Sequence, residues 1–451
     1  MVKTIKTKRL PKDPGPAGWN EIYKDKSSFP ALDTDIEVDW VIVGGGFAGL
    51  GAAKRLLQLL GSKERIAVIE ARGIAQGPAG RNSGFMLDLP HELNSDTYAG
   101  SKEQDLRQIR LNREAITMAE SIAQQYGMDK ALFSRSGKIT ASATDRGYRS
   151  IETYARHLTA LGEPYELLGA DDLHSLLGTE FYRKGLRTAR TAMIQPAGYI
   201  HSAYKGLVSE GVQVYECSPV VEMTLNDDVH TLICANGVVR AKNVIMAVNG
   251  HIQSFGFFKQ SLLHIFTYSS MTRALKNHEL KALGGIENWG VLPADPMGST
   301  IRKISDHAGS GHRIVVRNHA TLNQSMEASE GNLKDAARLQ DRSFARRFPM
   351  LKGVDMEYRW GGRLCLTYNS VPAFGEIENR VWSACCQNGL GTVKGMLSGM
   401  MAVDKAVLGD TELLNEFLIY QAPKRLPPEP FLSVGANATL KWKEWLSGIE
   451  L

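Results

Sequence analysis

The stretch that decides the fold is DWVIVGGGFAGLGAAKRLLQLLGSKERIAVIEA, residues 39–71. It begins with a short apolar, β-branched run at 39–43, which is typical of a buried parallel strand. Apolar residues then recur at helical spacing over 47–60, and a second apolar run follows at 66–69. A strand, a helix and a second strand in this order predict a βαβ unit.

Three glycines lie between the first strand and the helix, at the spacing of a dinucleotide-binding turn. Gly44 permits the tight turn, Gly46 lets a pyrophosphate approach the backbone, and Gly49 allows close helix packing. Glu70 ends the second strand, where a carboxylate accepts hydrogen bonds from a ribose 2′-hydroxyl and disfavours the 2′-phosphate of NADP. Because strand, helix and acid are in register, a nucleotide site is favoured over a glycine-rich loop without a ligand.

The segment ARGIAQGPAGRNSGFM, residues 71–86, distinguishes FAD from NAD. It is rich in glycine and small residues, includes Arg81 and Asn82, and is suited to wrap the pyrophosphate from its far side. A domain that binds NAD would normally continue into another helix at this point. We therefore expect FAD as the cofactor.

Length and composition indicate a globular enzyme with more than one domain. A chain of 451 residues exceeds one ordinary hydrophobic core, so two or three domains are expected. No apolar run approaches the roughly 18 residues that a membrane-spanning helix needs, and residues 1–38 lack the apolar stretch of a secretory signal. The net charge of +5 is small and the basic residues are dispersed, which gives nucleic-acid binding little support.

Cysteines and histidines show neither a disulfide pattern nor a metal-binding pattern. The five cysteines include no CxxC pair and are odd in number, which argues against a zinc site and a disulfide framework. They are Cys217, Cys234, Cys365, Cys385 and Cys386. The histidines without metal-ligand spacing are His91, His201, His251 and His264. We predict a reducing, cytoplasmic location and no bound metal.

Five motifs, two of them within the stretches already described, carry a resemblance to a known family. In chain order they are VIVGGGFAGL (41–50), GPAGRNSGF (77–85), QPAGYIHSAYKGLVSEGVQVYE (195–216), AKNVIMAVNGH (241–251) and ENRVWSACCQNGLGTVKGMLSGMMA (378–402). Their order and spacing resemble the FAD-dependent amine and D-amino-acid oxidase superfamily, including glycine oxidase, sarcosine oxidase and, more closely, γ-glutamylputrescine oxidase. The resemblance spans roughly residues 39–409.

The resemblance implies an α/β fold in which a Rossmann-like FAD-binding domain is interleaved with an α+β substrate domain built on an antiparallel sheet. The FAD-binding domain is expected to be discontinuous, over 39–95, 196–255 and 355–415. The substrate domain is expected over 96–195 and 256–354. An N-terminal arm (1–38) and a C-terminal tail (416–451) complete the chain.

The residues expected to hold FAD lie in the turns and at the strand ends of these motifs. The resemblance sets Val220 against the adenine and points the helix at 393–406 toward the flavin pyrimidine, with Lys394 adding charge. The full set is Gly44, Gly46, Phe47, Ala48, Gly49, Glu70, Ala71, Arg72, Gly77, Arg81, Asn82, Ser83, Val220, Asn249, Gly250, Gly389, Leu390, Gly391, Thr392 and Lys394. Non-covalent FAD is favoured, and attachment through Cys365 is the alternative, because the spacing from Cys365 to the following proline differs by one residue from that of sarcosine oxidases.

The chemistry implied by the resemblance is oxidation of the C–N bond of a small amine or amino acid by hydride transfer to flavin N5. The resulting imine then hydrolyses, and the protein supplies binding, orientation and charge. We expect no catalytic triad. Clustered arginines favour a substrate that bears a negative group. The substrate-contact candidates are His264, Tyr268, Met271, Arg302, Arg313, Arg317, Trp360 and Arg363, although the arginine position of glycine oxidase-like enzymes falls on Leu364.

Two alternatives stay open. Sarcosine oxidase-like enzymes place a lysine over the flavin to activate oxygen, whereas the matching strand here reads Val315, Val316 and Arg317. This difference keeps open a dehydrogenase that passes electrons to a quinone or a carrier protein instead of oxygen. A non-catalytic or tRNA-modifying flavoprotein is the other alternative, and the absence of a basic, aromatic-interleaved patch argues against it.

Overall fold

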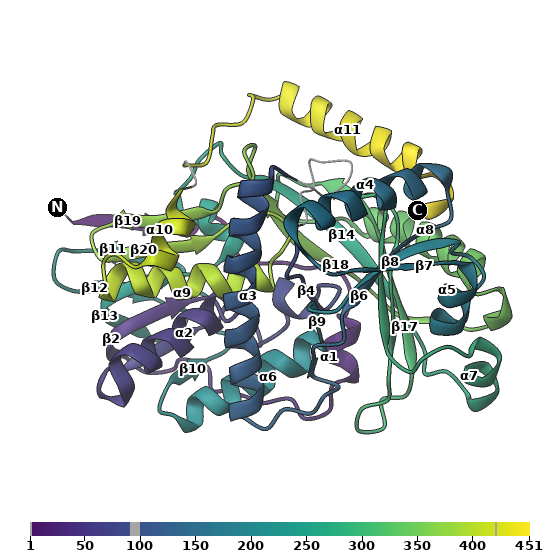
Figure 1. Ribbon diagram of the computed structural model, residues 1–451. Coiled ribbons are helices and arrows are strands. Elements are labelled where there is room, and N and C mark those ends of the chain that lie inside the picture. The colour runs from purple at the N-terminus through teal and green to yellow at the C-terminus, as the bar shows by residue number, and fades with distance from the viewer. Residues whose placement is uncertain (1, 91–99, 420–421) are drawn as a thin grey trace.

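The computed structural model describes residues 2–90, 100–419 and 422–451, so His91 and the 91–95 end of the first expected segment lie outside it. Two large sheets and their helices form the body of the molecule (Figure 1). The first sheet pairs its strands in the order β1 (Lys3–Lys6), β11 (Glu222–Leu225), β12 (His230–Ile233), β13 (Val238–Met246), β2 (Ile36–Val43), β3 (Ile66–Ile69) and β10 (Gln213–Tyr215). Strand β20 (Val381–Cys385) also pairs with β13, and β19 (Ala373–Glu378) pairs with β20.

The centre of the first sheet is parallel, as the apolar runs predict. Strands β2 and β3 pair in parallel with Val43 opposite Ile69, and β13 pairs with β2 with Met246 opposite Val43. The carboxyl ends of these strands therefore meet at one edge of the sheet, which is where open α/β sheets bind ligands.

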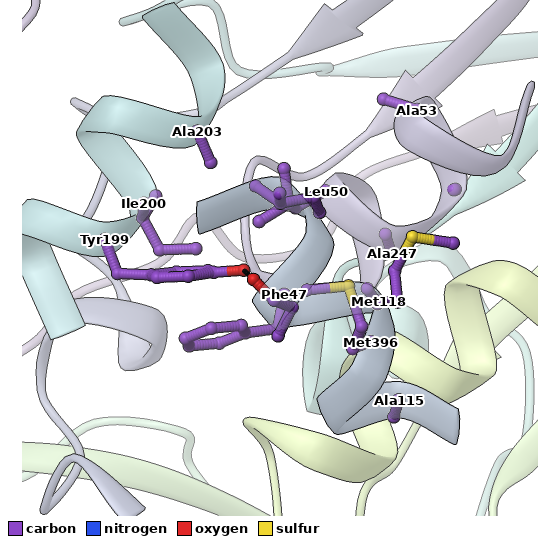
Figure 2. Close-up of a cluster of buried hydrophobic side chains, with 14 of the residues drawn as sticks. Phe47, Leu50, Ala53, Ala115, Met118, Tyr199, Ile200, Ala203, Ala247 and Met396 are labelled. Atoms are coloured by element: carbon purple, nitrogen blue, oxygen red, sulfur yellow. Dashed lines mark hydrogen bonds between the residues drawn. The ribbon is translucent and has the colours of Figure 1, made fainter. Parts of the chain in front are cut away.

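Helices cover one face of this parallel centre. They are α2 (Phe47–Leu60), α3 (Lys102–Gln125), α6 (Pro196–Ser209), α9 (Val393–Val407) and α10 (Glu412–Leu418). Figure 2 shows Phe47 and Leu50 of α2 among side chains of α3, α6 and α9. Helices α2 and α9 pack closely at Gly51, which has no Cβ. A Cβ there would lie 2.4 Å from the carbonyl oxygen of Met396.

The second sheet is mainly antiparallel. Its order is β18 (Met356–Leu366), β14 (Leu263–Thr272), β17 (Arg313–Leu322), β16 (Thr300–Ile304), β15 (Trp289–Pro293), β6 (Lys138–Ser142), β8 (Lys184–Thr188) and β7 (Glu166–Leu168). The helices around it are α4 (Asp145–Leu161), α5 (Ala170–Leu177), α7 (Asn277–Leu283), α8 (Glu330–Arg347) and α11 (Phe431–Ser447). A three-stranded sheet, β4 (Phe85–Met86), β9 (Ala192–Ile194) and β5 (Phe133–Ser134), and helix α1 (Gly18–Ile22) complete the described elements.

This architecture confirms the predicted fold class. In three of the expected segments, namely the arm, residues 355–415 and the tail, a strand or helix contacts one of the two large sheets. Strand β1 of the arm joins the first sheet, and β18 pairs with β14 in the second sheet although it falls within 355–415. Helix α11 of the tail contacts β17. None of the helices in the described ranges combines the length and apolarity that crossing a membrane requires.

Candidate functional site

A cavity of about 530 Å³ is lined by residues of both large sheets. On the nucleotide side it is bounded by the turns that follow β2, β3, β13 and β20. On the other side it is bounded by β14, β17, β18 and one face of α11. The cavity thus joins the predicted nucleotide loop to the antiparallel sheet.

The glycine turn after β2 has the shape that a dinucleotide needs. Gly44 has φ +109°, and a Cβ there would lie 2.6 Å from the carbonyl oxygen of Ala247. A Cβ on Gly46 would come no closer than 3.7 Å to its neighbours, so this position is open toward the cavity. Gly49 does not line the cavity, and a Cβ there would lie 2.0 Å from the carbonyl oxygen of Gly44. Gly49 therefore allows the start of α2 to lie against the preceding turn and does not line the cavity.

Glu70 lies at the carboxyl end of β3 and lines the cavity. Its carboxylate accepts hydrogen bonds from the backbone N–H of Gly45 at 2.8 Å and of Arg72 at 2.9 Å. Burial raises the pKa of Glu70. A carboxylate has about four acceptor positions, so two remain for ribose hydroxyls.

The segment after β3 is held in place by its own polar side chains. The guanidinium of Arg81 donates to the carbonyl oxygens of Gln76 at 2.7 Å and Gly361 at 3.1 Å. Asn82 donates to the carbonyl oxygen of Ala79 at 2.6 Å. Burial lowers the pKa of Arg81 to about 10. Both side chains line the cavity and fix the loop that borders it.

Two unsatisfied polar atoms lie beside the cavity after β13. Asn249 adopts a left-handed φ of +49°. Its Oδ1 and the Nε2 of His251 are buried and make no hydrogen bond within the described part of the chain. Both residues line the cavity, so these atoms suit a polar ligand. Burial lowers the pKa of His251 to about 2, so the imidazole is neutral at pH 7.

The turn after β20 leads into the N-terminus of α9 at the cavity. A Cβ on Gly391 would meet nothing within 4 Å, so its backbone is accessible to a ligand. The hydroxyl of Thr392 donates to the carbonyl oxygen of Phe85 at 2.6 Å and ties this turn to β4. Lys394 lies instead beside a second cavity of about 340 Å³, together with Asp105. Lys394 therefore does not line the main cavity, where it was expected to add charge.

The structure brings the predicted cofactor residues together. All of them line the main cavity except Gly49 and Lys394. The open glycine turn, the partly satisfied Glu70 and the unsatisfied atoms of Asn249 and His251 fit a dinucleotide such as FAD. No cluster of His, Cys, Asp or Glu suited to a metal ion occurs in residues 2–90, 100–419 and 422–451.

Three of the eight substrate-contact candidates line the cavity, namely His264, Arg317 and Arg363. The Nε2 of His264 lies 2.8 Å from Oε1 of Gln253, and burial lowers the pKa of His264 to about 4. Arg317 donates through Nε to Oγ1 of Thr267 at 3.3 Å.

The charge of Arg363 is already paired. Its guanidinium contacts both carboxylate oxygens of Asp13, at 2.8 and 3.2 Å, and the Asp13 side chain is fully buried. The N-terminal arm therefore supplies the anion that Arg363 was expected to bind in a substrate.

The other five candidates do not line the cavity. Arg302 is buried next to β4, with its guanidinium over the ring of Phe85, and it donates to the carbonyl oxygens of Gly84 and Ile194. Burial lowers its pKa to about 9. Arg313 pairs with Glu357 at the far end of β17.

The remaining three candidates are packing residues. The hydroxyl of Tyr268 lies 2.7 Å from that of Thr321, and its ring packs against α8. Met271 and Trp360 pack together in the core beside Gly18.

The sequence reasoning missed the part of the cavity formed by α11 and by His319 of β17. Ala436, Thr439, Leu440 and Lys443 line the cavity from α11, and His319 lines it from β17. Helical apolar spacing in the tail was a signal for a helix, but it does not indicate where the helix packs.

His319 is the extra residue of a β-bulge. The register shifts there, because Thr267 pairs with Ala320 and Tyr268 pairs with Asn318. His319 has φ +60°, which is unusual for a residue other than glycine. Bulges of this kind turn a side chain toward a site that a regular strand would not reach.

Comparisons with known proteins agree with this geometry. A family model described as FAD dependent oxidoreductase (DAO) matches residues 39–405. The probable oxidoreductase OrdL of Haemophilus influenzae is 23% identical over 402 residues, which cover 86% of this chain and 87% of that protein. Gamma-glutamylputrescine oxidoreductase of Escherichia coli is 24% identical over 411 residues, which cover 89% and 90%.

A solved structure shares the fold. Glycine oxidase from Geobacillus kaustophilus superposes with a TM-score of 0.67 at 17% identity, covering 87% of this chain and 100% of that chain. The family match extends from the strand before the glycine turn into α9, over most of the chain. The resemblance predicted from the motifs is confirmed, and so is the assignment as an FAD-dependent enzyme. This chain belongs to the DAO family of FAD dependent oxidoreductases.

Proposed function

We propose that this enzyme oxidises the C–N bond of a small amine or amino acid that bears a negative group. The observation that carries the proposal is one continuous cavity that reaches from Glu70 at the nucleotide loop to Arg317 on the antiparallel sheet. Bound FAD would accept the hydride equivalent from the carbon beside the nitrogen, and the resulting imine would hydrolyse to a carbonyl product.

The residues of this chain bind and orient the two reactants. Glu70 and the glycine turn hold the dinucleotide end of the cofactor, and the N-terminus of α9 places a positive dipole end at the cavity. Arg317 holds the substrate anion, which fixes the carbon to be oxidised relative to the cofactor. Val315 and Val316, which precede Arg317 on β17, are buried.

We propose that FAD is held without a covalent bond. Cys365 lines the cavity, but burial raises the pKa of its thiol well above the usual value. The thiolate needed for attachment is therefore disfavoured at neutral pH.

A dehydrogenase that passes electrons to a quinone or a carrier protein is the second candidate. Arg317 stands on the strand where the resemblance expects the oxygen-activating lysine of sarcosine oxidase-like enzymes. Oxygen is the first acceptor to test. We propose a cytoplasmic location for either activity.

The test is anaerobic reduction of the purified flavoprotein, followed through bleaching of its visible absorbance. Paired amines with and without a carboxylate are compared, and the reduced enzyme is then mixed with oxygen or with a soluble quinone. We expect the acidic amines to bleach the flavin at lower concentration. Equal bleaching by uncharged amines would remove the anionic substrate from the proposal, and no bleaching by any amine would remove the amine chemistry.

A further inference from the structure

Helix α11 carries an apolar stripe on its outer face. Phe431, Val434, Trp442 and Trp445 are 72%, 67%, 60% and 71% exposed, at spacings that place them along one side of a helix. The rings of Trp442 and Trp445 stack with their centroids 5.2 Å apart. Figure 1 shows α11 along the outer edge of the molecule, after an extended segment. Large aromatic side chains gathered in this way on a surface mark an interaction site.

The opposite face of α11 already has its contacts, so the orientation of the helix is fixed. Glu444 bonds to His319, and the hydroxyl of Ser447 donates to Asp295 at 2.8 Å. Leu440 and Lys443 line the cavity. Turning the stripe inward would break these contacts, so the stripe faces away from the described part of the chain.

The charges beside the stripe select the kind of partner. Lys441 is exposed next to Trp442, and Lys424 and Arg425 are exposed in the segment that leads to α11. The carboxylate of Glu444 is turned inward, and that of Glu429 accepts from Ser433. Lys441 therefore sets a positive charge directly beside the stripe, and two more positive charges lie in the segment that leads to the helix.

We propose that α11 binds the surface of a membrane rich in anionic lipids. An amphipathic helix with tryptophan and phenylalanine on one side and lysine at its border lies in the plane of the lipid headgroups. Tryptophan favours this depth because its ring is apolar and its N–H is polar. Because α11 also forms one wall of the cavity, the cavity would open beside the lipid surface.

The test is sedimentation of the FAD-loaded enzyme with vesicles of phosphatidylcholine alone or mixed with phosphatidylglycerol. We expect the mixed vesicles to retain the enzyme, and high salt to weaken retention. Trp442→Ser combined with Trp445→Ser should weaken it by at least about tenfold. The matched control is Tyr368→Ser, since Tyr368 is 66% exposed outside the helix. Flavin absorbance and melting temperature show that each variant is folded.

Three outcomes would overturn the proposal. The first is no retention on the anionic vesicles, and the second is equal retention of the double tryptophan variant. The third is a dimer, seen by light scattering, that the double variant converts to a monomer without any vesicle binding; the stripe would then join two copies of this chain. Amine oxidation is measured separately, so failure of the proposed function leaves this result unaffected.

Discussion

Nδ1 of His319 lies 2.7 Å from Oε1 of Glu444, and both side chains are 15% exposed. The same carboxylate oxygen accepts the backbone N–H of Ala320 at 3.2 Å. This pair joins the bulge in β17 to α11, a helix that lies beyond the family match at 39–405. The wall of the cavity on this side therefore depends on a segment outside the family core.

Replacing Glu444 by alanine should loosen α11. The variant loses two hydrogen bonds to the bulge, and a net loss of about 1–2 kcal/mol corresponds to roughly 5- to 30-fold faster hydrogen exchange in the helix. Glu444→Gln keeps an acceptor oxygen and should fall between the wild type and the alanine variant. Unchanged exchange in Glu444→Ala would show that other contacts alone hold the helix.

Glu70→Gln should weaken FAD binding. The glutamine side chain has a single acceptor oxygen, so it cannot serve Gly45, Arg72 and the ribose together. We expect the dissociation constant for FAD to rise by about 5- to 30-fold, or about 1–2 kcal/mol. Titration of the apoprotein with FAD, followed by flavin fluorescence, measures it. An unchanged constant would exclude Glu70 as a ribose ligand.

The first βαβ unit was predictable because its pattern is local. Helix α2 runs from Phe47 to Leu60 and β3 from Ile66 to Ile69, as the apolar spacing predicted, and β2 begins three residues earlier than expected. The side of each strand or helix that is buried against the sheet sets the spacing of its apolar residues. This spacing has a period of only a few residues, so it can be recognised within one short stretch. The turn glycines follow from the same short stretch.

The roles of the arginines were not predictable from local pattern. The carboxylate that pairs with Arg363 comes from Asp13, 350 residues away in the chain. Arg313 and Arg317 both lie on β17, but they are four strand positions, or about 13 Å, apart. Of the two, Arg317 lines the cavity and Arg313 does not. The position of α11 depends on its contact with the bulge at His319, and the spacing of apolar residues in the sequence does not predict a bulge.

The purified protein should be yellow and should release its flavin on mild acid precipitation. This follows from the buried thiol of Cys365, whose raised pKa disfavours attachment. The measurement is the absorbance of the supernatant after the protein is removed. Flavin that stays with the precipitated chain in the wild type, but not in Cys365→Ser, would establish a covalent link.

Acid should destabilise the enzyme partly through His201. Burial lowers the pKa of His201 to about 4, whereas an unfolded histidine titrates near 6.5. A depressed pKa gives stability that is present above pH 6.5 and is lost as the pH falls toward about 4. Between pH 7 and pH 5 this amounts to about 2 kcal/mol.

Urea unfolding at both pH values tests this prediction. His201→Gln cannot be protonated, so its free energy of unfolding should change less with pH than that of the wild type. Some dependence should persist because His251 and His264 also have lowered pKa values. His278→Gln, at an exposed position on α7, is the control and should behave as the wild type. An equal pH dependence in His201→Gln would contradict the assignment.

Arg317→Met should raise the half-saturation concentration of an anionic amine by about 10- to 150-fold. The expected loss of about 1.5–3 kcal/mol is that of a hydrogen bond to a charged group. Arg317→Lys keeps the charge but not the two-pronged geometry, so its effect should be intermediate. Arg313→Met removes the same charge from the same strand, outside the cavity.

The measurement is anaerobic flavin bleaching at increasing amine concentration, with the FAD absorbance of each variant as the check on folding. Uncharged amines serve as the second comparison, because losing Arg317 should leave their half-saturation nearly unchanged. If Arg317→Met and Arg313→Met weaken anionic amines equally, the effect comes from the net charge of the sheet. The substrate anion would then have to be held by another cavity residue, and Lys443 of α11 is the first to test.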